Sequence, residues 1–106
     1  MRILSITTAL ALAGCATAAD KDDARKAWGD CVMSAVARLD DGKTDPVSVA
    51  YGVAPQCAVQ YDRLSQMMVR ENITDAGQAN MRQLMKDGEV KMITSAILTY
   101  RASRKR

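Results

Sequence analysis

The sequence predicts an all-α protein of three or four helices, in which the first two form an antiparallel hairpin stapled by a disulfide. Three observations support this fold class. Apolar residues recur at spacings of three and four along most of the chain, as on one face of a helix. Capping residues bracket these periodic stretches. Two of the three cysteines fall where they would face each other across the first turn.

The first helix is expected over residues 20–39. Asp20, Asp22 and Asp23 cluster at its start, where the helix dipole favours negative charge. Gly42 is a natural C-terminal stop. The predicted buried face consists of Ala24, Trp28, Cys31, Ala35 and Leu39.

The second helix is expected from about residue 46 to residue 71. Asp45 is a good N-cap, and Pro46 suits the first helical position. Pro55 lacks an N–H and clashes with the preceding turn. Because the apolar phase continues through it, we expect a kink and not a break. The predicted buried face consists of Ala50, Ala54, Cys57, Tyr61, Leu64 and Met68.

The register of the hairpin predicts which residues face each other. In an antiparallel helix pair, facing positions have numbers that sum to a constant set by the turn. Cys31 and Cys57 average to residue 44, and the turn indicated by capping residues, 41–45, is centred on residue 43. The same register places Trp28 opposite Tyr61. A bridge closing a loop of 25 residues stabilises a small domain by roughly 3 to 4 kcal/mol in the chain-entropy model.

The last part of the chain is helical, with Asn72 or Thr74 as its cap. Apolar residues form one stripe before Gly88 and a second stripe after it. The second stripe is rotated about the helix axis by about a third of a turn relative to the first. The segment 86–88 is also turn-like. We therefore favour a break there over one long helix that contacts two surfaces. The two stripes consist of Met81, Leu84 and Met85, and of Val90, Ile93, Ile97 and Tyr100.

The start of the chain is typical of an export signal. Residues 1–2 give a short positive region, and residues 3–13 give an apolar stretch, about half of the roughly 20 residues that a membrane span needs. Leu12-Ala13-Gly14-Cys15 resembles a bacterial lipobox, which implies cleavage before Cys15 and a lipid on its thiol. The alternative is an A-x-A cut near Ala18-Ala19 that discards Cys15. A third reading keeps Cys15 in the folded domain.

These readings divide the chain into a leader over residues 1–19, a helical domain over 20–100 and a basic C-terminal tail over 101–106. If Cys15 carries lipid, the protein is expected at the outer membrane facing the periplasm, and otherwise in the periplasm or secreted. Without Cys15 two cysteines remain, an even number typical of a disulfide in an oxidising compartment.

Residue types needed for common catalytic sites are missing. The sequence has no histidine, which excludes Ser-His-Asp and Cys-His nucleophilic sites. Paired carboxylates such as Asp22-Asp23 and Asp40-Asp41 are explained as caps and turns. We therefore expect no enzyme, no catalytic residue and no cofactor. Met81, Met85 and Met92 have the thioethers that bind Cu(I) or Ag(I). Core packing is the favoured role, so no metal site is predicted.

Positive charge is concentrated at the C-terminal end, in Arg101, Arg104, Lys105 and Arg106. Apart from these and Arg2, 10 basic side chains stand against 12 acidic ones. This is unlike the basic stripe of a nucleic-acid-binding protein. One interpretation is a frayed helix end whose cations suit the dipole. The other is contact with an anionic envelope polymer such as lipopolysaccharide, anionic phospholipid or peptidoglycan.

Two further resemblances concern proteins of the bacterial envelope. A short helical lipoprotein with a basic end is similar to the major peptidoglycan-linked outer-membrane lipoprotein, whose terminal lysine is joined to the wall. Here Arg106 is terminal and Lys105 penultimate, so wall attachment is not implied. Trp28-Gly29-Asp30-Cys31 followed by Cys57 resembles small exported helical proteins of proteobacteria, and that likeness implies no activity.

The sequence thus favours a non-enzymatic cell-envelope protein that binds an envelope protein or an anionic polymer, and not nucleic acid. Contact with the membrane would come through a lipid on Cys15. The alternative is a small carrier of an apolar ligand or of a soft metal ion, held between alanine-rich helices.

Overall fold

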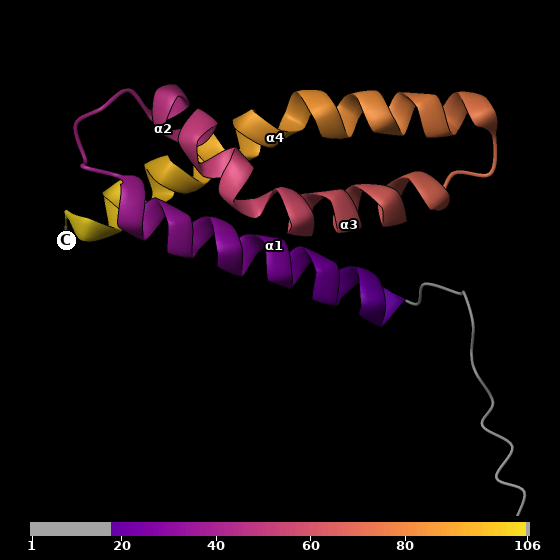
Figure 1. Ribbon diagram of the computed structural model, residues 1–106, viewed down its shortest axis with the longest axis horizontal. Helices are drawn as coiled ribbons and strands as arrows, with labels where there is room; N and C mark the ends of the chain where they lie inside the picture. Colours follow the sequence, from indigo (N-terminus) through magenta and orange to yellow (C-terminus); the bar gives the residue numbers. More distant parts are fainter. Residues whose placement is uncertain (1–17, 106) are drawn as a thin grey trace, which may run out of the picture.

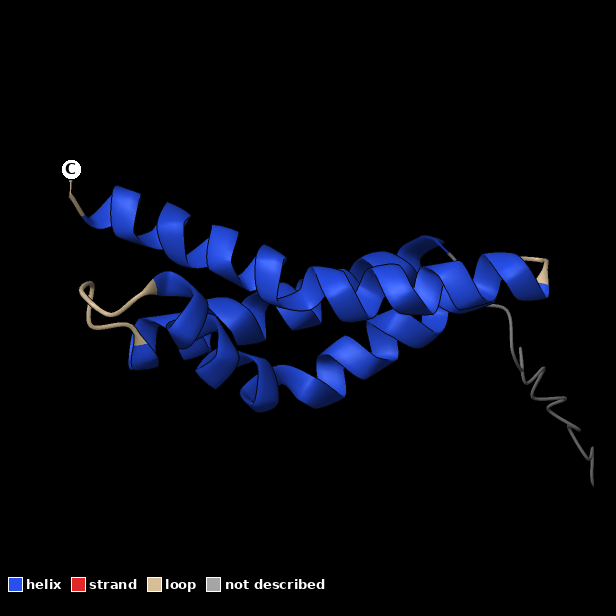
Figure 2. Cartoon of the chain, turned by 90° about the horizontal axis from the view of Figure 1, so that it is seen from above, coloured by secondary structure: helices blue, strands red, loops and turns tan. Residues whose placement is uncertain are grey.

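The computed structural model describes residues 18–105. This part of the chain is all-helical and contains the Cys31–Cys57 disulfide, so the predicted all-α class and cysteine pairing are confirmed. Two loops at opposite ends of the molecule join the helices (Figures 1 and 2). The elements are α1 (Ala18–Leu39), α2 (Pro46–Val53), the 3₁₀ helix η1 (Ala54–Cys57), α3 (Ala58–Arg70) and α4 (Asp75–Arg104).

The loop between α1 and α2 is built by the turn residues that the sequence indicates. Gly42 has a φ of +76°, a left-handed conformation that other residues adopt only at a cost. The Asp41 carboxylate accepts hydrogen bonds from the backbone N–H groups of Lys43 and Thr44, at 2.8 and 2.7 Å. Asp45 caps α2 by accepting from the N–H of residue 48 at 3.1 Å. The predicted cap and turn are confirmed.

The predicted kink at Pro55 takes the form of a 3₁₀ turn. The α-helix α2 ends at Val53, the 3₁₀ helix η1 follows it, and α-helical structure resumes at Ala58. A proline removes one backbone donor, and a tighter 3₁₀ turn accommodates that loss without ending the helical path. The chain from residue 46 to residue 70 therefore bends while remaining helical, as expected.

The expected break at Gly88 is wrong, because α4 continues without interruption from Asp75 to Arg104. A glycine inside a helix costs only about 1 kcal/mol relative to alanine, and packing on either side overrides that cost. The Gln83 side chain also donates to the Asp87 carboxylate one turn away, at 2.9 Å. Thr74 caps the helix by accepting from the N–H of Gly77.

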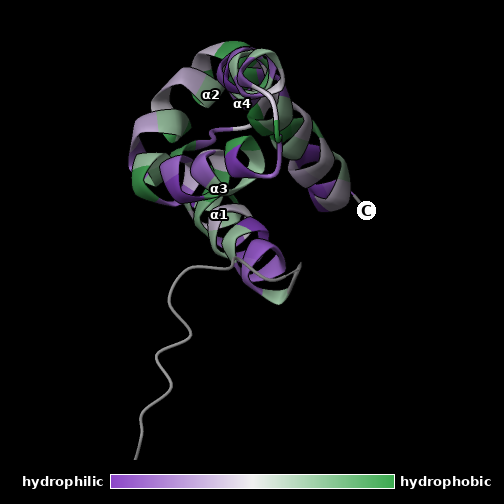
Figure 3. Cartoon of the chain, turned by 90° about the vertical axis from the view of Figure 1, so that its right-hand side faces the viewer, coloured by the Kyte–Doolittle hydropathy of each residue, from purple (hydrophilic) through white to green (hydrophobic). Residues whose placement is uncertain are grey.

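The rotated stripes of α4 contact two separate hydrophobic clusters, as the long-helix alternative predicted. Ile93 and Ile97 lie in the first cluster and Met85 in the second. Figure 3 views the bundle end-on and shows hydrophobic and hydrophilic residues alternating around the helices. The first cluster contains Val32, Ala35, Val36, Val49, Ala50, Val53, Cys57, Ile93 and Ile97, and the second Ala24, Tyr61, Leu64 and Met85.

Two predicted core residues are exposed. Leu39 is 46% exposed and Leu84 is 65% exposed. Leu39 is the last residue of α1, beyond the last buried turn of that helix. Leu84 stands beside Met85, which takes the buried position on that turn of α4. Among the helices of residues 18–105, none is long and apolar enough to cross a membrane.

Candidate functional site

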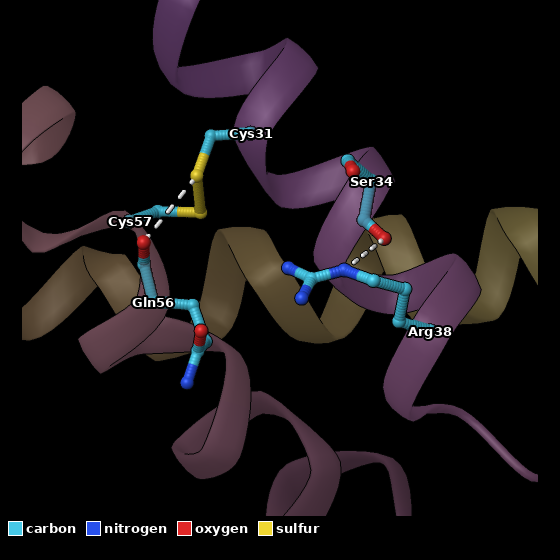
Figure 4. Close-up of a disulfide and its surroundings, with 5 residues drawn as sticks. All are labelled: Cys31, Ser34, Arg38, Gln56 and Cys57. Carbon is cyan, nitrogen blue, oxygen red and sulfur yellow. Dashed lines mark hydrogen bonds between the residues drawn. A yellow bond between two sulfur atoms is a disulfide. The ribbon is translucent and has the colours of Figure 1, made fainter.

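The disulfide joins α1 to the 3₁₀ turn. The Cα atoms of Cys31 and Cys57 are 5.8 Å apart, and Cys57 is fully buried in the first hydrophobic cluster. Figure 4 shows the bridge, with the carbonyl oxygen of Gln56 lying 3.6 Å from Cys31 Sγ. The predicted pairing of Trp28 with Tyr61 is also confirmed, since their ring centroids are 5.1 Å apart. The cysteine pair therefore has a structural position next to the core.

The basic end of the chain is not a free tail. Residues 101–104 form the last turn of α4, and the Arg101 side chain is only 17% exposed. Its guanidinium donates to the Asp40 carboxylate, with Nη2 to Oδ1 at 2.6 Å and Nε to Oδ2 at 3.0 Å, and to the carbonyl of Thr44. The hydrogen bond from Arg101 lowers the pKa of Asp40. Arg101 thus holds the α1–α2 loop against α4.

The neighbouring cations remain accessible. Arg104 and Lys105 are exposed, and the Arg104 guanidinium lies 5.5 Å from the centroid of the Tyr100 ring. Together with Arg101 they line a hollow of about 270 Å³ whose other wall includes Asp40 and Asp41. Carboxylates on that wall reduce the attraction of this end for an anionic polymer. Arg106 and the predicted lipidation residue Cys15 lie outside the described part of the chain.

A largely apolar groove lies where α1, α3 and α4 meet. Its volume is about 400 Å³, within the range of about 300 to 1,000 Å³ that small-molecule sites occupy. Unlike the basic end, it has mostly hydrophobic walls, with a single charged residue among the residues that line it. These residues are Arg25, Trp28 and Gly29 from α1, Leu64 and Met68 from α3, and Met85 and Met92 from α4.

Trp28 is the one aromatic residue among those that line the groove. Its ring packs on Tyr61 at an interplanar angle of 48°. Its Nε1 atom is buried and has no hydrogen-bond partner among the described residues. Buried indole N–H groups usually have a partner, and leaving one unsatisfied costs about 1 to 3 kcal/mol. The burial of this atom also keeps it out of contact with anything at the surface of the groove.

Gly29 keeps the wall of the groove open. It lies in the middle of α1, where glycine costs roughly 0.5 to 1 kcal/mol relative to alanine. A Cβ placed on Gly29 would meet nothing within 4 Å, so no neighbouring atom requires the glycine. Its φ is not in the left-handed region either. A larger side chain at this position would extend into the space that the groove occupies.

The methionines considered as soft-metal ligands separate into two groups. Met85 and Met92 line the groove together with Met68, whereas Met81 packs at the edge of the second cluster. Arg25 Nη2 lies 3.8 Å from Met68 Sδ. Within residues 18–105, no group of three or more acidic, histidine or cysteine side chains is placed to hold a metal ion.

A second hollow beside the groove is more polar. It is lined in part by Tyr61, Asp62, Arg82 and Glu89. Burial raises the pKa of Tyr61 to about 12, and its hydroxyl donates to the carbonyl of Met85. Burial, with a smaller contribution from Asp62, raises the pKa of Glu89. Side chains of both charges line this hollow, so it is less suited to an apolar ligand than the groove.

The fold and the groove define a small, disulfide-linked helical protein with an apolar groove on one side of its bundle. In comparisons with known proteins, no family model, no curated protein and no solved structure matches the chain. Sequence reasoning considered Trp28 beside Gly29 as a possible docking pocket, favoured a packing role for Trp28, and did not single out Arg25. The signal that points to the groove is a glycine in the middle of a helix, next to the chain's single tryptophan.

Proposed function

We propose that this protein acts by binding, not by catalysis, and that it carries a small apolar ligand in the groove between α1, α3 and α4. The observation that carries the proposal is the groove itself, with apolar walls and an open position at Gly29. The absence of histidine from the sequence also favours binding over acid–base or nucleophilic catalysis.

This proposal places the carrier function ahead of attachment to an envelope polymer through the basic end. Arg101 is engaged with Asp40, so fewer cations are available there than the sequence suggests. Polymer or partner binding remains a second candidate, favoured by the exposure of Arg104 and Lys105. It predicts salt-sensitive sedimentation with peptidoglycan or anionic vesicles that the pair Arg104→Gln and Lys105→Gln abolishes. Deleting residues 101–106 is a poorer test, because the deletion also removes Arg101, the ion-pair partner of Asp40.

We further propose that the protein is exported, with Cys15 either lipidated or removed with the leader. The Leu12–Cys15 motif and an even cysteine count in the remaining chain support this. The finer topology belongs to the same proposal: an antiparallel hairpin of residues 20–39 and 46–71, supported by the facing pairs Cys31–Cys57 and Trp28–Tyr61. The intact mass of the protein from its own host reports cleavage, acylation and the disulfide together.

Groove binding is tested with a neutral apolar dye, N-phenyl-1-naphthylamine, whose fluorescence rises in apolar surroundings. We expect saturable binding to the wild type and at least a tenfold loss in Gly29→Leu, whose side chain would fill the groove. Gly52→Leu is the matched control. Gly52 is also a helical glycine with open space where a Cβ would stand, but it lies in α2 away from the groove. Equal binding by both variants would overturn the groove as the binding site.

A further inference from the structure

We infer that the ligand of the groove is a single-chain fatty carboxylate, with its carboxylate at Arg25 and its hydrocarbon chain along the apolar wall. This inference rests on the proposed carrier function and names its ligand class. Two observations carry it: the apolar walls of the groove and the positive charge at Arg25.

The walls suit an alkyl chain. Leu64 supplies a branched side chain, and Met68, Met85 and Met92 supply three flexible thioethers that line one groove. Methionine adapts its conformation to irregular apolar shapes more readily than branched side chains do. A flexible hydrocarbon chain would bury apolar area against all of these side chains, which is favourable by about 25 cal/mol for each Å² removed from water.

Arg25 supplies the positive charge. Its nearest carboxylate partner is Asp22, with Nη1 to Oδ1 at 3.8 Å and both side chains more than half exposed. Such exposed pairs are weak, so the guanidinium is free to bind another anion. A guanidinium binds a carboxylate through two parallel hydrogen bonds, which fixes both position and orientation. A ligand carboxylate would therefore add to the apolar contact without breaking a strong ion pair.

A soft metal ion is the competing occupant, because three thioethers line the groove. The position of Arg25 opposes it. Arg25 Nη2 lies 3.8 Å from Met68 Sδ, so a cation bound to that sulfur would stand close to a permanent positive charge. Like charges at such separations repel, and the repulsion grows where water is partly excluded. The same charge attracts a carboxylate.

The experiment follows the fluorescence of Trp28, the only tryptophan in the chain, during titration with dodecanoate and with dodecanol at neutral pH. We expect dodecanoate to bind at least tenfold more tightly than dodecanol, because only the carboxylate forms charge-assisted hydrogen bonds with the half-exposed Arg25 guanidinium. Arg25→Gln should remove that preference. Arg38→Gln is the matched control, because Arg38 is an exposed arginine of α1 that does not line the groove.

The outcomes separate this inference from the proposed function. If dodecanoate and dodecanol bind equally, or if Arg25→Gln leaves the preference intact, the carboxylate assignment is wrong while the carrier function stands. If neither binds, and the naphthylamine dye does not bind either, the carrier function itself is wrong. Stoichiometric uptake of Cu(I) that shifts the Trp28 emission, without dodecanoate binding, would make the groove a soft-metal site and overturn the inference.

Discussion

Asp40 and Arg101 are 61 residues apart in the sequence, and their side chains form a two-point ion pair with Arg101 Nη2 2.6 Å from Asp40 Oδ1. Asp40 is almost fully shielded from solvent, with 1% of its side chain exposed. It also accepts from the backbone N–H of Gly42. The pair therefore ties the loop after α1 to the last turn of α4, and it converts a residue of the predicted basic tail into part of the fold.

Asp40→Asn should lower the melting temperature and flatten its dependence on acid pH. The pKa of Asp40 is lowered in the folded state by the Arg101 hydrogen bond. The stability that the ionised Asp40 contributes is thus present above the unfolded-state pKa near 4. It is lost as pH falls through the lower folded-state pKa. Thermal melts between pH 2 and 7 measure this. Asp41, whose pKa is also lowered, leaves part of the acid dependence in place.

The matched control is Asp30→Asn, because Asp30 also pairs with a cation, Lys26, but on an exposed helix surface. Such exposed i, i+4 pairs contribute little to stability because solvent screens them. Asp30→Asn should leave the melting curve and its pH dependence nearly unchanged. Equal effects of the two substitutions would show that the Asp40–Arg101 pair does not hold the loop.

Replacing both cysteines, as Cys31→Ser with Cys57→Ser, should reduce the free energy of unfolding by roughly 3 kcal/mol. The bridge links positions 26 residues apart and constrains the unfolded chain over that distance. Urea denaturation of the wild type and the double variant measures the difference. Unreduced protein, unfolded in denaturant, should take up no alkylating reagent at these positions. Two equivalents of label would contradict the disulfide.

The helical fold and the cysteine pairing were predictable because both depend on local pattern. Helical spacing reports the buried face of each helix, and the capping residues around Gly42 place the turn, so simple register arithmetic brings Cys31 to Cys57. The continuity of α4 was not predictable in this way. Gly88 and its neighbours look like a turn, but Met85 before it and Ile93 after it pack into two clusters that exist only in the folded molecule.

Gly29→Leu and Gly52→Leu should each raise the free energy of unfolding by about 0.5 to 1 kcal/mol. Both glycines lie within helices, with open space where a Cβ would stand, so the gain comes from restricting the unfolded chain and improving helix propensity. Chemical denaturation measures both. A fall in stability for Gly29→Leu alone would mean that the space beside Gly29 is packed in solution, contrary to an open groove.

One of the three tyrosines should ionise at about pH 12, and that component should be absent in Tyr61→Phe. Burial raises the pKa of Tyr61 to about 12, so the stability that it contributes is complete below pH 10 and is lost as pH rises towards 12. Ultraviolet absorbance of the tyrosinate during alkaline titration measures this. Loss of the high-pH component from a variant other than Tyr61→Phe would contradict the assignment.

The groove illustrates what sequence reasoning misses in a helical protein. Trp28 and Met68 were placed on inward faces, but a groove depends on how far apart three helices stand, which no single-helix pattern reports. The prediction that Arg101 belongs to a free basic tail was wrong for a similar reason. Arg101 looks like a free cation in the sequence, and its partner Asp40 becomes a neighbour only when α4 runs back to the α1–α2 loop.

The most direct test of groove binding is nuclear magnetic resonance of the protein labelled with ¹³C at its methionine methyl groups, titrated with N-phenyl-1-naphthylamine. A naphthalene ring in the groove should shift the methyl signals of Met68, Met85 and Met92, which line it, and leave Met33, an exposed residue of α1 outside the groove, unchanged. Binding that shifts the methyl signal of Met33 and leaves the signals of the three groove methionines unchanged would contradict the account.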